Sequence, residues 1–145
     1  MPKIRLAEKT EFKTLTRIWL NATLTAHSFV DQKYWESGLP DMEHKWLPMS
    51  ENYIIEIEEL QRIAGFISLV DNYLAAIFID PNDQGKGLGS ELLNKAKQLR
   101  NSLTLKVYQK NETALRFYLA HNFVIDYEEV DSSTGEKEYL MKWHK

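Results

Sequence analysis

Cysteine is absent from the 145-residue chain. Its absence excludes disulfides, cysteine nucleophiles and thiolate metal sites. We also predict no catalytic metal, because His44, His121 and His144 show no metal-ligand spacing with other candidate side chains. No long apolar run follows the first residues, so no signal peptide is expected, and we predict a cytoplasmic protein.

Long apolar segments and a strong excess of one charge are also lacking. No stretch approaches the ~20 apolar residues that a membrane span needs, so we expect no membrane partner. The formal net charge of −3 provides no electrostatic footprint for nucleic acid. With 43% hydrophobic and 27% charged residues, the composition is that of a globular protein, and the length predicts one domain over 1–145.

Hydrophobic periodicity predicts the element order β-α-α-β-β-β-α-β-α-β-β. The expected strands are 3–7, 53–57, 62–70, 73–79, 103–107, 123–130 and 137–143, and the expected helices are 10–24, 31–46, 87–100 and 112–121. Hairpins combined with one strand–loop–helix–strand unit indicate the α/β (α+β) class, with a mixed central sheet of about seven strands flanked by about four helices.

Several local features sharpen this prediction. Thr10 is the expected N-cap of the first helix, and Gly38-Leu39-Pro40 should interrupt the second. The continuous apolar strand 73–79 is typical of a central strand covered on both faces. The helix at 87–100 should bury a stripe formed by Leu88, Leu92, Ala96 and Leu99.

Glycine is scarce, yet three of the six glycines fall within Gln84-Gly85-Lys86-Gly87-Leu88-Gly89. This segment joins the strand 73–79 to the following helix. Backbone N–H groups can converge there without obstruction by Cβ atoms, and the helix N-terminus adds unpaired donors and a positive dipole end. The segment therefore predicts a phosphate site, to which Lys86 adds a mobile positive charge.

The spacing of the glycines distinguishes among phosphate-binding folds. A nucleoside-triphosphate loop requires G-x-x-x-x-G-K-[ST], whereas Lys86 precedes Gly87 and no Ser or Thr follows it. A Rossmann fingerprint requires G-x-G-x-x-G after an early βαβ unit, which is missing. A methyltransferase-type G-x-G-x-G is the nearest rival, but only 56 residues follow Gly89 (145 − 89), too few for the remaining βαβ units.

The segment around this loop resembles the acyl-CoA signature Q/R-x-x-G-x-G/A of the GNAT superfamily of N-acetyltransferases, through Gln84, Gly87 and Gly89. Residues 111–123 resemble the family's N-x-x-A-x-x-F-Y-x-x-x-G-F helix. Its usual glycine is replaced by Asn122, which tolerates the left-handed backbone of a helix C-cap. The segments 19–35 and 108–111 are similar to the small bacterial YiaC/YjaB-like branch.

The resemblance implies transfer of an acetyl group from acetyl-CoA directly to a primary amine, either a small amine or a protein lysine, and the branch favours protein lysine. It also implies a homodimer as an expected assembly. The implied acetyl-CoA contacts are Ile77, Phe78, Ile79, Gln84, Gly85, Lys86, Gly87, Leu88, Gly89, Ser90, Asn111, Ala114, Phe117 and Tyr118.

Tyr118 is where the family places a tyrosine that protonates or hydrogen-bonds the departing thiolate. The resemblance does not identify the residue that acts as general base. Many members carry a strand glutamate where this chain has Tyr73, and the alternatives are Asp71, Glu56, Glu58, His27 or a chain of waters. The missing glutamate also leaves open a second function, a GNAT-fold module that senses acyl-CoA with little or no turnover.

The acceptor amine is expected on the side of the first two helices and the strand at 73. The residues expected there are His27, Phe29, Tyr34 and Tyr73, together with Trp35. Aromatic side chains with polar tips suit the lining of a cleft. Trp19 and Trp46 are expected in the core instead.

Overall fold

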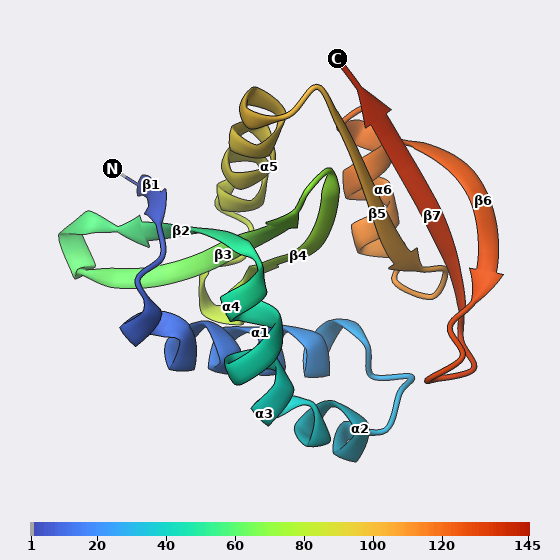
Figure 1. The fold of residues 1–145 in the computed structure, drawn as a ribbon, viewed down its shortest axis with the longest axis horizontal. Coiled ribbons are helices and arrows are strands. Elements are labelled where there is room, and N and C mark those ends of the chain that lie inside the picture. Colours follow the sequence, from blue (N-terminus) through green and yellow to red (C-terminus); the bar gives the residue numbers. More distant parts are fainter. Residues whose placement is uncertain (1) are drawn as a thin grey trace.

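The computed structural model describes residues 2–145, which form one seven-stranded sheet in the order β1-β2-β3-β4-β5-β7-β6 (Figure 1). The strands are β1 (Pro2–Leu6), β2 (Glu51–Ile57), β3 (Arg62–Val70), β4 (Tyr73–Ile79), β5 (Ser102–Tyr108), β6 (Val124–Val130) and β7 (Lys137–His144). All neighbouring strands are antiparallel except β4 and β5, which are parallel. The predicted mixed sheet is confirmed.

Four helices of six or more residues accompany the sheet: α1 (Phe12–Ala26), α2 (Gln32–Ser37), α5 (Leu88–Leu99) and α6 (Glu112–Ala120). The shorter pieces are α3 (Leu39–Asp41), the π-helical turn η2 (Met42–Trp46), α4 (Leu47–Met49), and the 3₁₀ turns η1 (Lys9–Glu11), η3 (Glu58–Leu60) and η4 (Pro81–Asp83). In Figure 1, α1 to α4 lie below the half of the sheet formed by β1 to β4, α5 lies above it, and α6 lies behind β5 and β7.

Two apolar clusters hold these layers together. One packs α5 and α6 on the sheet through fully buried side chains such as Ile67, Leu92 and Phe123. The other packs α1 on the opposite face of β2, β3 and β4, through side chains such as Leu15 and Phe66. Burial of this apolar surface is the main favourable contribution to folding.

The sheet divides between β4 and β5, which pair at a single position, Tyr73 with Thr104. In the ladder between β3 and β4, Ser68 pairs with Ala76 and Leu69 with Leu74, so Ala75 is an extra, bulged residue. A bulge bends its strand and increases its twist, which carries the rest of β4 away from β5. The prediction of a central strand covered on both faces is confirmed, because Leu74 packs into the cluster under α5 and α6 and Ala76 into the cluster under α1; the bulged Ala75 is exposed.

The first helix also begins differently from the prediction. Thr10 is not its cap, because the chain enters α1 through η1, where Glu8 and Glu11 form a capping box. The Glu11 carboxylate accepts a hydrogen bond from the Glu8 backbone N–H at 2.8 Å and pairs with Arg5 on β1 at 2.8 Å. The capping box therefore stands where Thr10 was expected, and the Arg5–Glu11 ion pair ties it to β1.

The predicted interruption of the helical segment 31–46 at Gly38-Leu39-Pro40 is confirmed, because α2 ends at Gly38 and Pro40 stands in the first turn of α3. One further expectation needs correction. Leu99, assigned to the buried stripe of α5, is 37% exposed at the end of the helix, whereas Leu93 is fully buried. The rest of that stripe, Leu88, Leu92 and Ala96, is confirmed.

Both predicted ends of α6 are confirmed. The side chain of Asn111 caps the helix by accepting a hydrogen bond from the Ala114 backbone N–H at 3.2 Å. Asn122 adopts the left-handed conformation, with φ of 70°, which a glycine would otherwise supply. The substitution of Asn for Gly therefore leaves the helix end intact.

Gly65 on β3 gives the first testable prediction. A Cβ atom there would lie 2.5 Å from both the Phe78 carbonyl oxygen and the Ile79 Cδ1 atom, so backbone would have to move. We expect Gly65→Ala to lower the free energy of unfolding by about 1–3 kcal/mol, the usual cost of overpacking. Denaturant unfolding measures it, with Gly89→Ala as the control, because a Cβ there meets Phe117 at an ordinary 3.5 Å. Equal stability of Gly65→Ala and wild type would contradict this account.

Candidate active site

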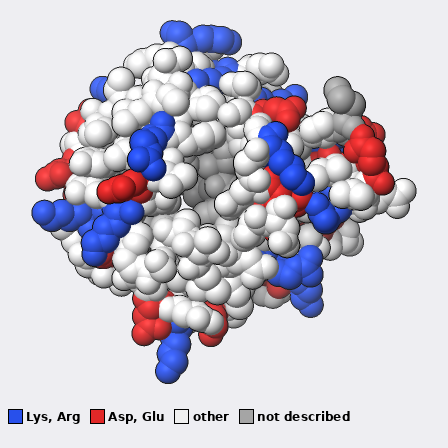
Figure 2. Space-filling view, turned by 180° about the vertical axis from the view of Figure 1, so that it is seen from behind, with Lys and Arg blue, Asp and Glu red and all other residues white. Residues whose placement is uncertain are grey.

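A cleft of about 1310 Å³ opens where β4 and β5 separate. Its walls come from β4, the glycine loop and the start of α5 on one side, and from β5 and α6 on the other. Figure 2 shows the hollow from behind, walled mainly by uncharged atoms with charged side chains of both signs along its border. Clefts for drug-sized ligands run to roughly 1,000 Å³, so this one has room for a long ligand and a second molecule.

The glycine loop lies at one end of the cleft. Gly85 and Gly87 have φ of 82° and 79°, the left-handed region, and no heavy atom lies within 4 Å of where a Cβ would stand at either position. Gly87 is the N-cap of α5 and supplies no side chain to the first N–H groups of that helix. These donors and the helix dipole therefore face open space suited to an anion.

A buried carboxylate holds this loop in place. Asp83 is 0% exposed and accepts hydrogen bonds from Arg62 on β3 and from Lys86 Nζ, the latter at 3.2 Å. Gln84 Nε2 donates to the Ile79 carbonyl oxygen at 3.1 Å. Lys86 thus contacts Asp83, and it does not line the cleft, whereas all the other predicted acetyl-CoA contacts do. Asp83 could not be recognised from the sequence, because only burial distinguishes it from a solvated loop carboxylate.

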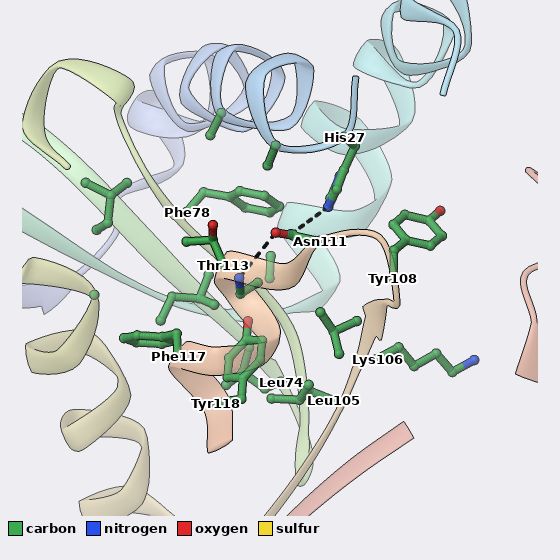
Figure 3. Close-up of a pocket in the computed structure, with 18 of the residues that line it drawn as sticks. His27, Leu74, Phe78, Leu105, Lys106, Tyr108, Asn111, Thr113, Phe117 and Tyr118 are labelled. Carbon is green, nitrogen blue, oxygen red and sulfur yellow. Dashed lines mark hydrogen bonds between the residues drawn. The ribbon is translucent and has the colours of Figure 1, made fainter. Parts of the chain in front are cut away.

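Tyr118 reaches the cleft from α6. Its side chain is 8% exposed, and its hydroxyl points into the cavity between Phe117 and Leu105 (Figure 3). Burial raises the pKa of the Tyr118 phenol well above its usual value, and the nearby Tyr73 adds to the rise. The hydroxyl therefore stays protonated and is available as a hydrogen-bond donor inside the cleft.

His27, at the end of α1, joins that helix to α6. The Asn111 side-chain oxygen is engaged by Ala114, so its Nδ2 donates to His27 Nε2 at 3.1 Å (Figure 3). The ring proton then lies on Nδ1, which is buried without a partner. Burial lowers the pKa of His27 to about 4. The imidazole is therefore neutral at neutral pH, and its observed contact positions Asn111.

The predicted acceptor residues divide into two groups. His27, Trp35 and Tyr73 line the cleft, whereas Phe29 and Tyr34 do not. Phe29 packs behind the wall against the Tyr108 ring at 5.5 Å, and Tyr34 packs against Trp35 at 4.9 Å. Both rings therefore support lining residues.

One tryptophan was also placed wrongly. Trp46, expected in the core, is 47% exposed and lines the cleft, because it lies in the irregular η2 turn. Trp19 packs against the core, as expected, and contacts Trp35 edge-to-face at 6.2 Å.

The carboxylates proposed as bases lie elsewhere. Asp71 is in the turn between β3 and β4, Glu56 pairs with Arg5, and Glu58 is in η3, and none of them lines the cleft. Two other carboxylates, Asp131 and Glu138, line its β5–β7 side. Neither could be singled out from the sequence, since their places depend on contacts with Tyr108, which lies on a different strand: it pairs with Glu138 and donates a hydrogen bond to Asp131.

The loop and the α6 helix, which meet in one cleft, also match known proteins. The model of the acetyltransferase (GNAT) domain matches residues 49–125, which hold both the glycine loop and Tyr118. The chain belongs to the GNAT acetyltransferase family. It is 32% identical to the peptidyl-lysine N-acetyltransferase YiaC of Escherichia coli, over 97% of this chain and 92% of that one. It is 31% identical to the peptidyl-lysine N-acetyltransferase YjaB of the same organism, over 84% and 82%.

Solved structures of GNAT proteins share the fold. The apo form of YjaB from Escherichia coli has a TM-score of 0.87 at 25% identity, covering 99% of this chain and 97% of that one. The PaiA N-acetyltransferase of Thermoplasma acidophilum, solved with coenzyme A, has a TM-score of 0.84 at 17% identity, covering 100% and 99%. These structures confirm the predicted fold, and the family model with the curated relatives identifies the chain as an N-acetyltransferase.

Residues 2–145 contain no group of three or more His, Asp or Glu side chains placed to hold a metal ion. No helix among them is long and apolar enough to cross a bilayer.

The left-handed glycine of the loop gives the second prediction. Gly87→Ala places a Cβ at φ of 79°, which costs roughly 1–2 kcal/mol and distorts the donors of the α5 N-terminus. We expect weaker acetyl-CoA binding, measured by calorimetry. Gly135→Ala carries the same strain at φ of 76° in the turn between β6 and β7 and should leave the affinity unchanged. Equal affinity of the two variants would argue against an anion site at the loop.

Proposed function

We propose that this GNAT protein transfers the acetyl group of acetyl-CoA to the side-chain amine of a lysine in a peptide or protein, with residues 1–145 acting as one domain. The observation that carries the proposal is that one cleft contains both the anion-binding glycine loop and the protonated Tyr118 hydroxyl. The lysine acceptor is supported by the resemblance to YiaC and YjaB, both named peptidyl-lysine N-acetyltransferases.

The residues present fit an elongated acyl-CoA. The open positions beside Gly85 and Gly87 leave space for a pyrophosphate against the N–H groups of α5. Beyond Tyr73, β4 has no strand partner on the side facing β5, so its peptide groups there can pair with the amides of a pantetheine arm. Asn111, Ala114 and Phe117 line the same cleft from α6.

The reaction requires a neutral amine and a stabilised leaving group. A lysine amine has a pKa of ~10.4, so it arrives as an ammonium ion and must lose a proton before its lone pair attacks the thioester carbon. As the C–S bond breaks, the thiolate gains a donor from the Tyr118 hydroxyl. Tyr118 suits this role because burial keeps its proton in place.

The alternative of a sensing module with little turnover accounts for the loop but not for Tyr118. The Tyr118 hydroxyl points into the cleft and has no hydrogen-bond partner among residues 2–145, so it is free to donate to a departing thiolate, a role that a sensing module does not need. We therefore favour turnover. The cytoplasmic location and the homodimer stay predictions.

Acetyl-CoA binding and lysine transfer give the third prediction. Acetyl-CoA at about 100 times its Kd should stabilise the fold by about 2.7 kcal/mol, seen as a rise in Tm. S-adenosylmethionine and ATP should give no rise. Release of CoA should depend on added lysine peptide and should exceed the release with a peptide whose only amine is the N-terminus. An absent Tm shift with acetyl-CoA would overturn the proposed function.

The Tyr118 hydroxyl gives the fourth prediction. Tyr118→Phe removes the donor but keeps the ring, so kcat should fall by about 10²–10⁴ while the KM for acetyl-CoA changes little. Because the pKa of Tyr118 is raised above its usual ~10, wild-type kcat should not decline from loss of this proton below pH ~10. Tyr127→Phe, at an exposed position of β6, is the control. Full activity of Tyr118→Phe would refute the role of the hydroxyl.

A further inference from the structure

Glu138 is a carboxylate in an unusual position for a strand residue. It lies on β7 opposite Tyr108 of β5 and Glu129 of β6, on the sheet face that turns away from the core residues Met141 and Trp143. Its neighbours there bury it, so the residue is only 7% exposed. It nonetheless lines the cleft that contains Tyr118.

The Glu138 carboxylate has no hydrogen-bond or ion-pair partner among residues 2–145, and its Oε2 atom is buried. The surrounding charges are engaged with one another. Lys106 Nζ pairs with Glu129 Oε1 at 3.2 Å, and the Tyr108 hydroxyl donates to Asp131 Oδ2 at 2.5 Å. The one cation in this group therefore has another acidic partner.

The buried Oε2 atom is costly in this state, because it has lost water and no donor among residues 2–145 replaces it. An ammonium group would remove this cost, since it supplies both a positive charge and three donors. The acidic neighbours Glu129 and Asp131 make the position more attractive to a cation and exclude a second anion. The site thus has the chemistry of an ammonium subsite.

We propose that Glu138 binds the ammonium group of the acceptor lysine in the cleft and accepts its proton, acting as the general base. The proposal rests on the proposed function, lysine acetylation, and adds the group that prepares the amine. Glu138 takes the place of Asp71, Glu56 and Glu58 as the candidate base, since none of these three lines the cleft.

The lysine ammonium transfers one proton to the Glu138 carboxylate, which gives a neutral amine and a carboxylic acid. The amine lone pair forms the C–N bond to the thioester carbon, and the C–S bond breaks. The thiolate takes the Tyr118 proton, and the new amide nitrogen returns one proton to the phenolate. Glu138 then releases its proton to solvent, so the products are an acetyl-lysine, free CoA thiol and one proton.

The surroundings of Glu138 raise the pKa of its carboxyl group. Burial is the largest cause that raises its pKa, Asp131 and Glu129 raise it further, and Lys106 lowers it. The other titratable groups that face it are Tyr73 from β4, whose pKa Glu138 raises in turn, and Tyr108. A carboxylate with a raised pKa is a stronger base and accepts a proton from an ammonium more readily.

The test compares Glu138→Gln with Glu128→Gln, an exposed carboxylate of β6 outside the cleft. With a lysine peptide, kcat/KM of Glu138→Gln should fall by about 10²–10⁴ at neutral pH, while the acetyl-CoA Tm shift stays as in wild type. Wild-type kcat/KM should form a plateau between the raised pKa of Glu138 and ~10. The kcat/KM of Glu138→Gln should instead rise tenfold per pH unit up to the lysine pKa of ~10.4. The reason is that this variant can use only the lysine amine that is already neutral in solution. Glu128→Gln should behave as wild type.

A stability measurement separates this role from a structural one. The folded-state pKa of Glu138 is raised, so ionisation above that pKa disfavours folding and the neutral glutamine removes the cost. Glu138→Gln should therefore match or exceed the wild-type Tm at pH 7.5, and the difference should vanish below about pH 4.

The outcomes distinguish the two proposals. If wild type fails to acetylate lysine peptides, the proposed function is wrong and the role of Glu138 falls with it. If wild type is active and Glu138→Gln keeps its rate and pH profile, only the role of Glu138 is wrong. A variant with lower Tm and a lost acetyl-CoA shift also overturns the proposal, because Glu138 would then be structural.

Discussion

The separation of β4 from β5 is the constraint on which the rest of the molecule depends. Two parallel strands at the centre of a sheet would ordinarily pair along their length, yet these pair only at Tyr73 and Thr104. The bulge at Ala75 bends β4 at this point. The unpaired peptide groups of β4, the glycine loop that follows it and the α6 helix beyond β5 then all face one opening.

Local sequence signals predicted the parts of this site that depend on local physics. The glycine spacing at 84–89 identified a phosphate loop, because glycine is the residue that adopts the left-handed backbone found at Gly85 and Gly87. Asn111 and Asn122 identified both ends of α6 for a similar reason. The element order followed from periodicity, and with it the sheet. These features need no knowledge of distant contacts.

What could not be predicted depends on contacts between distant segments. The ion pair between Arg5 and Glu11 joins β1 to the segment that enters α1, and the separation of β4 from β5 accompanies a bulge at Ala75 that residue types do not predict. Asp83 and Glu138 look like ordinary surface carboxylates in sequence, since burial by Arg62 and Tyr108 is a tertiary property. The base was therefore sought near Tyr73 in the chain, whereas the cleft brings a carboxylate from the last strand.

Burial in one cleft has opposite consequences for its ionisable groups, and together these consequences match the chemistry. Loss of water disfavours whichever form is charged. It therefore keeps the Tyr118 hydroxyl protonated as a donor, makes the Glu138 carboxylate a stronger base and leaves His27 neutral. Acetyl transfer to an ammonium needs one acid and one base at the same pH. In the mechanism that we propose, one cleft supplies both, with Tyr118 as the acid and Glu138 as the base.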